Sequence, residues 1–408
     1  MASLATLWLS ATDKYETFEE GYNADNSFSI SIPTTNEFRW VEGTESLLVG
    51  TAGEEWRVYS EKTDSGLTPT SYKIIMQSGF GSNIVQPVIA NSVILFCDTN
   101  GRRLHELTWD DLRQKFLAPD MSVLAEHITK TGIVCMALQK YPDMIVWCVL
   151  TDGSLISFTY NREQNVIAWA DHTMIDVTVK SVCVTPNSTT NEDEITITAE
   201  RMINSVAKTY IEKFSARELP ASIADCYFVD CGITYSGAET GTITGLSHLV
   251  GETVSVFGSG GTSGTYTVYE ELVVASNGSV TLPTVLTVQQ TVTKAQVGKP
   301  YTYELQPMRL DIGQGSVLGS KKKIPEIVVS LQDSAEVKYG DSSTTLKEID
   351  ITTVDLINKS SVTGLYTGDI SLHFDGGFSV DDSIIISGSK PLPCTVRCLI
   401  PKVEITGR

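Results

Sequence analysis

The sequence lacks the long apolar runs that membrane and secreted proteins carry. No run approaches the roughly 20 apolar residues that span a bilayer. Residues 1–10 also lack a basic segment ahead of an apolar one, which a signal peptide would have. Neither membrane insertion nor secretion is therefore expected.

Positive charge is scarce as well. The chain has 30 basic against 49 acidic residues, a formal net charge of −19. The three consecutive lysines at 321–323 form its one basic run, which we interpret as a solvated strand flank that discourages edge pairing. A protein that binds nucleic acid tightly needs clustered Lys and Arg side chains, so stable binding of DNA or RNA is disfavoured for this chain.

Zinc-site spacing is missing among the eight cysteines. Most of them lie inside apolar strand-like runs, where a thiol behaves as a small hydrophobic group. The two close pairs, Cys226/Cys231 and Cys394/Cys398, have neither a two-residue spacing nor companion histidines. Reduced cysteines, no metal and no cofactor are expected.

Catalytic motifs are also missing. The sequence has no P-loop, no Gly-x-Ser-x-Gly elbow and no His-Glu-x-x-His. None of the five histidines lies next to an obvious nucleophile in the sequence, and a histidine beside a carboxylate more often has a structural role. We assign no catalytic residue and expect no enzyme, although these are the best acid or base candidates: Glu126 with His127, His172 with Asp171, and His105 with Glu106.

What the sequence does have is a repeat. Pairs of apolar runs begin at Arg39, Gln86, Ile133 and Ser181, so the starts differ by 47, 47 and 48 residues. A period of about 40 to 50 with up to four strands per unit is typical of β-propeller blades. We therefore predict an all-β chain with propeller-like repeats. Either residues 1–33 and the C-terminal strands supply a further blade that closes the ring, or the ring is incomplete in this chain.

The composition changes after the repeats, which predicts three regions. Propeller-like blades occupy 1–217, a small antiparallel β-domain rich in Gly, Thr and Ser occupies 218–296, and further β-strands occupy 297–408. In the second region we expect a turn at Asn277-Gly278 and a flexible hairpin tip at 259–264. The one expected helix covers 120–129, with Asp120 or Ser122 as its cap.

Several motifs, in order and at matching spacing, resemble one family of bacteriophage proteins. They are SATDKYETFEEG (10–21), FRWVEGTESLLVGTAGEEW (38–56), QSGFGSNIVQPVIANSVILFCDTNGRRLHEL (77–107), DMSVLAEHI (120–128), PDMIVWCVLTDGSLISFTYNREQNVIAWADH (142–172), GTITGLSHLVGETVSVF (241–257), GKPYTYELQPMRL (298–310), LYTGDISL (365–372) and PLPCTVRCLIPKVEI (391–405). The chain resembles the tail nozzle proteins of short-tailed phages, also called tail tubular protein B or phage stabilisation protein. Members of that family commonly have further β-structure before the segment that corresponds to Leu7.

The resemblance implies a structural virion protein in the phage tail, assembled in the host cytoplasm. It implies a ring of subunits, usually six, that meets the tail adaptor and portal-side proteins and the tail fibres. The ring would enclose a channel through which DNA passes without specific binding. Six copies at −19 would carry 6 × 19 = 114 negative charges, which would repel phosphates from the wall. The alternatives are a propeller that binds host surface glycans and, third, a glycan hydrolase.

Overall fold

The computed structural model describes residues 5–62, 66–174, 176–189, 191–220, 222–264, 266–311, 318–349, 365–374, 376–380 and 383–405. Within these ranges, the regular elements are β-strands and three short 3-10 helices, η1 (Ile223–Asp225), η2 (Ser247–Leu249) and η3 (Gly261–Ser263). The predicted all-β class is confirmed. The chain forms two compact units: unit 1 is Met1–Arg201 with Thr209–Ala216, and unit 2 is Met202–Lys208 with Arg217–Arg408.

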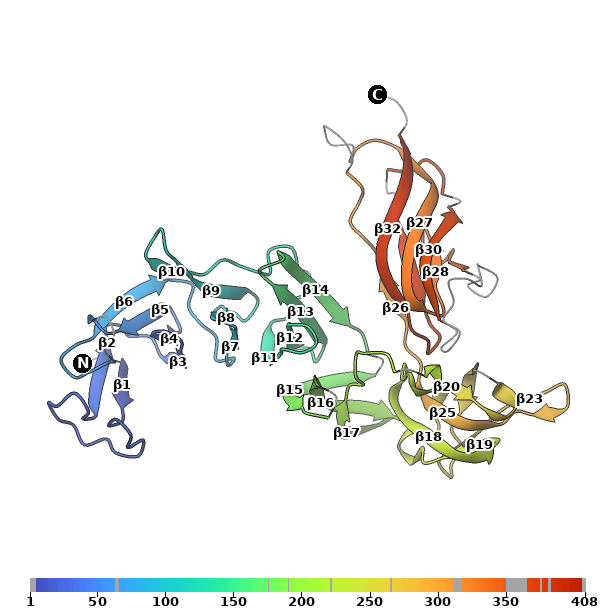
Figure 1. Ribbon diagram of the computed structural model, residues 1–408, viewed down its shortest axis with the longest axis horizontal. Helices are drawn as coiled ribbons and strands as arrows, with labels where there is room; N and C mark the ends of the chain where they lie inside the picture. Colours follow the sequence, from blue (N-terminus) through green and yellow to red (C-terminus); the bar gives the residue numbers. More distant parts are fainter. Residues whose placement is uncertain are drawn as a thin grey trace. The chain divides into compact units, whose positions relative to one another are not determined.

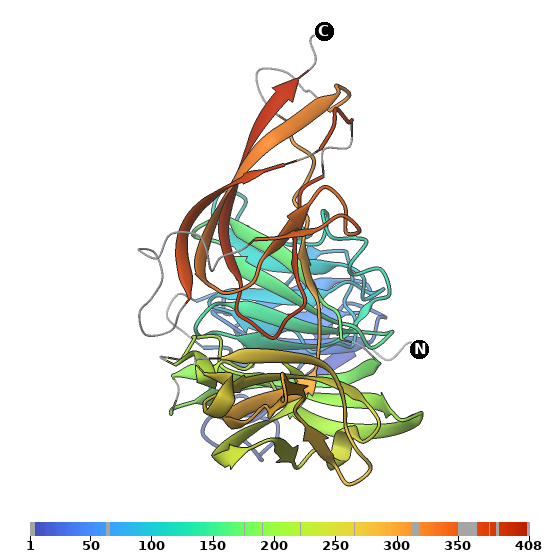
Figure 2. The ribbon, with the colours of Figure 1, turned by 90° about the vertical axis from the view of Figure 1, so that its right-hand side faces the viewer.

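Unit 1 is a stack of antiparallel sheets that follow one another in chain order (Figures 1 and 2). The N-terminal pair is β1 (Ala5–Leu9) and β2 (Phe28–Ile32). Blade 1 is β3 (Phe38–Gly43), β4 (Leu47–Thr51), β5 (Glu55–Tyr59) and β6 (Lys73–Ser78), and blade 2 is β7 (Val88–Ala90), β8 (Val93–Cys97), β9 (Leu104–Asp110) and β10 (Lys115–Leu117). Blade 3 is β11 (Ile133–Gln139), β12 (Ile145–Leu150), β13 (Leu155–Asn161) and β14 (Val166–His172), and blade 4 is β15 (Val177–Asn187), β16 (Glu192–Ile203) and β17 (Val206–Lys213).

The second strand of each inner blade is buried on both faces. In β8, Ile94 and Phe96 pack toward Trp40 of blade 1. The alternate residues of β8, such as Leu95, pack toward Val146 of blade 3. Because side chains alternate across a strand, a sheet stacked on two neighbours needs apolar residues at every position of its central strands. This requirement produces the recurring apolar runs in the sequence.

The two outermost sheets of the stack are built differently. In β2, Ile30 and Ile32 pack against blade 1, whereas Ser31 faces away from it and is exposed. In β16, Ile195 and Ile197 pack against blade 3, and they alternate with Thr196 and Thr198. Serine or threonine thus alternates with the packed isoleucines in both end sheets, as in the terminal units of a repeat array, and Trp8 of β1 is exposed beside the serines.

A backbone hydrogen bond recurs at three junctions between blades. The amide of Ser82 donates to Thr51 O at 2.7 Å, that of Ile133 to Gly101 O at 2.7 Å, and that of Val179 to Gly153 O at 2.8 Å. Each bond ties the segment entering a blade to the turn between the second and third strands of the blade before it. The junctions therefore recur along the chain as the strands do, at intervals of 46 to 52 residues.

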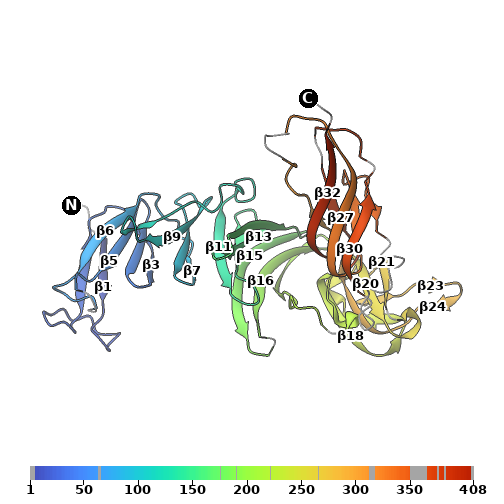
Figure 3. The same cartoon turned by 45° about the horizontal axis from the view of Figure 1, so that its top comes forward.

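Unit 2 begins with a small β-domain. Its main sheet has the order β18-β25-β20-β21, from β18 (Asp230–Thr240), β25 (Val292–Lys299), β20 (Thr253–Ser259) and β21 (Thr267–Val273). Two smaller pairs join it: β19 (Thr242–Thr244) with β22 (Ser279–Thr281), and the projecting hairpin β23 (Thr284–Val285) with β24 (Val288–Gln289) (Figure 3). Strand β25, the inner strand that pairs with both β18 and β20, continues to Lys299.

The glycine-rich segment 259–264 lies between the paired strands β20 and β21, at the tip of a hairpin as the sequence predicted, and side-chain contacts anchor it. Ser263 is buried, and its hydroxyl lies 2.7 Å from the Tyr269 hydroxyl and donates to Thr291 O at 2.9 Å. Gly260 and Gly261 have φ of 73° and 56°, a backbone region that side chains disfavour. The glycines therefore permit a tight turn anchored to the start of β25.

The C-terminal part of unit 2 contains two sheets around one apolar core. One sheet has the order β26-β31-β28-β29 and the other β30-β27-β32. The strands are β26 (Tyr303–Leu305), β27 (Lys322–Ser334), β28 (Lys338–Gly340), β29 (Lys347–Glu348), β30 (Tyr366–His373), β31 (Ile385–Gly388) and β32 (Thr395–Ile405). The last strand, β32, pairs with β27, so the described C-terminal strands form sheets of their own within this unit.

The predicted helix over 120–129 is also wrong. The segment is a chain of turns, in which the amides of Ala125 and Ile128 donate to the carbonyls three residues earlier. Val123 and Leu124, expected on an apolar helix face, are exposed, and Ile128 packs into the core of blades 2 and 3. A stretch this short gains little from helix formation, so its contacts with the neighbouring blades decide its shape.

Candidate functional site

A surface hollow lies at the β8–β9 turn of blade 2. It has a volume of about 640 Å³ and is lined by Asp98, Asn100, Arg102 and Arg103. An Asp98 carboxylate oxygen accepts the amides of Arg102 at 2.9 Å and Arg103 at 3.1 Å, and Gly101 supplies the φ of 71° that closes the turn. The sequence Asp-Thr-Asn-Gly therefore builds a rigid turn that presents two arginines.

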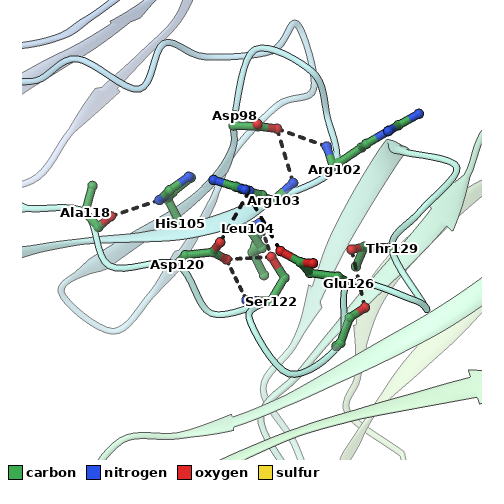
Figure 4. A network of polar contacts seen from close by, with 11 residues as sticks. Asp98, Arg102, Arg103, Leu104, His105, Ala118, Asp120, Ser122, Glu126 and Thr129 are labelled. Atoms are coloured by element: carbon green, nitrogen blue, oxygen red, sulfur yellow. Dashed lines mark hydrogen bonds and ion pairs between the residues drawn. The ribbon is translucent and has the colours of Figure 1, made fainter.

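Arg103 faces two carboxylates from the segment that follows blade 2 (Figure 4). Its Nε lies 3.6 Å from Asp120 Oδ2, and a terminal nitrogen lies 3.9 Å from Glu126 Oε1. The other Asp120 oxygen accepts the Ser122 amide at 2.8 Å and its hydroxyl at 2.6 Å, while the same hydroxyl accepts the Leu104 amide at 3.2 Å. This network fastens the crossover to β9, and its charges nearly balance.

Glu55 occupies a different environment, next to the crossover from blade 1 to blade 2. Its side chain is fully buried, and the hydroxyls of Ser78 and Ser82 donate to it, the second at 2.8 Å. Burial raises the pKa of the Glu55 carboxyl, and these hydroxyls together with the backbone of Phe80 and Gly81 oppose that rise. A raised carboxyl pKa suits a general acid, but this carboxyl is closed off from solvent and holds the crossover.

His105 and Glu106 were candidates for an acid–base pair because they are adjacent in the sequence. In strand β9 their side chains point to opposite faces of the sheet. The His105 ring is buried between Phe80, at 4.3 Å between ring centroids, and Phe96, at 5.4 Å, and its Nδ1 lies 2.9 Å from Ala118 O. Glu106 is buried and pairs with Arg162 of blade 3. Since neighbours on a strand point to opposite faces, the two do not form a pair.

His172 has a partner that sequence reasoning missed. Its Nε2 lies 2.8 Å from the Ser157 hydroxyl, and its ring packs on Trp147 with centroids 4.8 Å apart. Burial lowers the pKa of His172, and the charge of Asp171 opposes this effect. Ser157 is only 6% exposed, so a polymeric substrate cannot reach its hydroxyl. The register of the β13–β14 hairpin places His172 opposite Leu155 and diagonal to Ser157, so counting from the turn could have brought the two side chains together.

Glu126 and His127 lie on the turns after blade 2, and both are exposed. Glu126 contacts Arg103 as described. In the described part of the chain, no group of three or more His, Cys, Asp and Glu could hold a metal ion, and none of the eight cysteines forms a disulfide. Among the same residues, no helix is long and apolar enough to cross a membrane.

Comparison with known proteins adds little to this description. The chain matches no protein-family model and no curated protein. Among solved structures it is similar to an exo-β-1,3-galactanase from Phanerochaete chrysosporium, crystallised with β-1,3-galactotriose, at 12% identity over 88% of this chain and 75% of that chain, with a TM-score of 0.23. A TM-score this low carries no argument about the site. The strand pairing itself defines the class, an all-β protein with propeller-like stacked sheets.

Proposed function

We propose that this chain is a structural protein of a phage tail, a nozzle subunit that forms a ring around the channel for genome ejection. The observation that carries the proposal is where the resembling motifs lie. Residues 38–56 contain Glu55, and residues 77–107 contain the crossover that it holds, the turn at Asp98 and Arg103. Residues 120–128 contain Asp120 and Glu126, the two carboxylates that face Arg103. The motifs thus coincide with the junctions that hold the blades together.

The side chains with acid or base chemistry support the same proposal. Glu55, Asp98, Asp120 and His105 all bond to a crossover or a turn of the scaffold. Such contacts hold the turns and crossovers of the scaffold in fixed positions. A structural part of a phage tail requires a rigid scaffold of this kind. The acidic composition fits a conduit, because a negatively charged wall does not retain DNA.

Two measurements test the proposal. Negative-stain imaging of the purified chain, alone and mixed with the adaptor protein of the same phage, is expected to reveal rings in the mixture. Incubation with bacterial polysaccharide is expected to release no reducing ends. Release of reducing ends that tracks with the purified chain would contradict a structural role, and a failure to join the adaptor in any mixture would contradict the nozzle assignment.

A further inference from the structure

The segment 10–27, which joins β1 to β2, holds three aromatic side chains in solvent. We call it the aromatic loop. Tyr15 is 81% exposed, Phe18 51% and Tyr22 95%. Single exposed apolar residues are ordinary on a protein surface, but several large rings on one short segment are typical of interaction surfaces.

The aromatic loop is fixed by its own hydrogen bonds. The amide of Ala11 donates to Thr17 O at 2.9 Å, and that of Thr12 donates to Asp25 O at 2.9 Å. The Ser29 hydroxyl of β2 donates to Glu20 Oε1 at 2.8 Å, which ties the loop to its sheet. A loop ordered before binding loses less conformational entropy when it docks, so its rings are prepared for contact.

The charge of the aromatic loop selects the kind of partner. It carries the acidic residues Asp13, Glu16, Glu19, Glu20 and Asp25 against a single basic residue, Lys14. Guanidinium and ammonium groups bind both carboxylates and aromatic faces, so this combination suits a cationic partner. A nucleic acid, or a second copy of a chain with net charge −19, would meet like charge there.

We propose that the aromatic loop is a docking surface for an arginine- or lysine-rich segment of another protein. Carboxylates draw in the cationic side chains, and the rings of Tyr15, Phe18 and Tyr22 hold them by cation–π contacts. The proposal does not depend on the phage-tail assignment, because it rests on the exposure and charge of this loop. It adds to that assignment the chemistry of one partner surface.

The first test removes the rings and keeps the charge. A fluorescently labelled arginine–glycine repeat peptide is titrated with the full chain and with the triple variant Tyr15→Ala/Phe18→Ala/Tyr22→Ala, and binding is followed by anisotropy. We expect the affinity to fall about tenfold. The matched control Leu112→Ala/Leu286→Ala/Phe378→Ala removes three exposed apolar side chains elsewhere, and it should bind within about twofold of the unchanged chain.

The second test separates the loop from the general attraction of an acidic protein for a basic peptide. Asp13→Asn/Glu16→Gln/Glu19→Gln should weaken binding about tenfold at low salt. Glu163→Gln/Asp171→Asn/Glu271→Gln makes the same change in net charge at exposed positions outside the loop. It should leave the affinity within about twofold.

Three results would overturn the proposal. The loop variants and their controls could bind the peptide equally, which would show that only net charge matters. The unchanged chain could fail to bind the peptide at all. A neutral oligosaccharide panel could lose binding in the aromatic variant while peptide binding is unchanged, which would make the loop a glycan site. Tryptophan fluorescence of each variant before titration verifies that unit 1 is folded, and no readout depends on ring assembly.

Discussion

Blades 2 and 3 and the two end sheets of unit 1 use the same strand geometry with different residue patterns. Strand β8 reads Val-Ile-Leu-Phe-Cys and is buried at every position, whereas β2 reads Phe-Ser-Ile-Ser-Ile and alternates. A sheet between two neighbours has two apolar faces, and a sheet at the end of the stack has one. The comparison shows that the pattern of apolar and polar residues in a strand depends on whether its sheet lies inside the stack or at its end. The following substitutions test this relation.

The largest expected effect comes from a cavity in an inner blade. Leu95 is fully buried in β8, so Leu95→Ala should lower the free energy of unfolding by about 3 kcal/mol. Urea unfolding followed by tryptophan fluorescence reports on unit 1 alone, because all six tryptophans lie between residues 8 and 169. Ser31→Ala on the polar face of β2 is the control, expected within about 0.5 kcal/mol. Equal losses at both positions would contradict the comparison.

The next effect concerns the buried carboxyl that joins blade 1 to blade 2. Glu55→Ala leaves the hydroxyls of Ser78 and Ser82 without their acceptor and should cost about 2 kcal/mol by the same assay. Glu55→Gln keeps the shape and an acceptor oxygen, so its loss should be smaller. A loss for Ala no greater than that for Gln would show that the junction does not depend on this side chain.

Glu55 should also make the free energy of unfolding of unit 1 depend on pH. Its pKa in the folded state is raised above the ordinary value of 4.5, so the folded state binds this proton more tightly than the unfolded state does. The stability that the proton contributes is present below pH 4.5 and is lost as pH rises through the raised value. Glu55→Gln does not titrate, so the difference in unfolding free energy between wild type and this variant should shrink as pH rises. A difference that grows with pH would refute the sign.

A smaller effect is expected at the surface hollow. Arg103 is about half exposed, and its contacts with Asp120 and Glu126 are 3.6 and 3.9 Å long. Exposed ion pairs of this kind stabilise little, so Arg103→Ala should cost below about 1 kcal/mol. A loss of unfolding free energy as large as that of Leu95→Ala, measured in the same urea titration, would mean that the junction depends mainly on this network for its stability.

The smallest effect on stability should come from the polar end of the stack. Thr196→Val/Thr198→Val preserves shape on β16 and should change the unfolding free energy by no more than about 0.5 kcal/mol. It would turn an end face into an apolar one like those between blades, so we expect self-association, visible as a higher sedimentation coefficient. An unchanged coefficient would mean that end-face polarity does not keep the stack from extending.

The candidate site was predictable only in part. The Asp-Thr-Asn-Gly turn was readable, because such residues close tight hairpins for backbone reasons. The partners of Arg103 were not, since Asp120 and Glu126 reach it through a crossover that the sequence presents as a helix. Adjacent His105 and Glu106 gave a false pair, while Ser157 and His172, 15 residues apart, make a real contact.

The sequence by itself determined the all-β class, the 47-residue period and the strands whose two faces are apolar, because residue alternation and turn chemistry act over a few positions. Only the tertiary structure decided that 120–129 is a set of turns, that β32 pairs with β27, and that Glu55 and His105 serve the junctions. Those outcomes depend on which distant segments come into contact. Local propensity is too weak to fix such contacts, and burial against a neighbouring sheet overrides it.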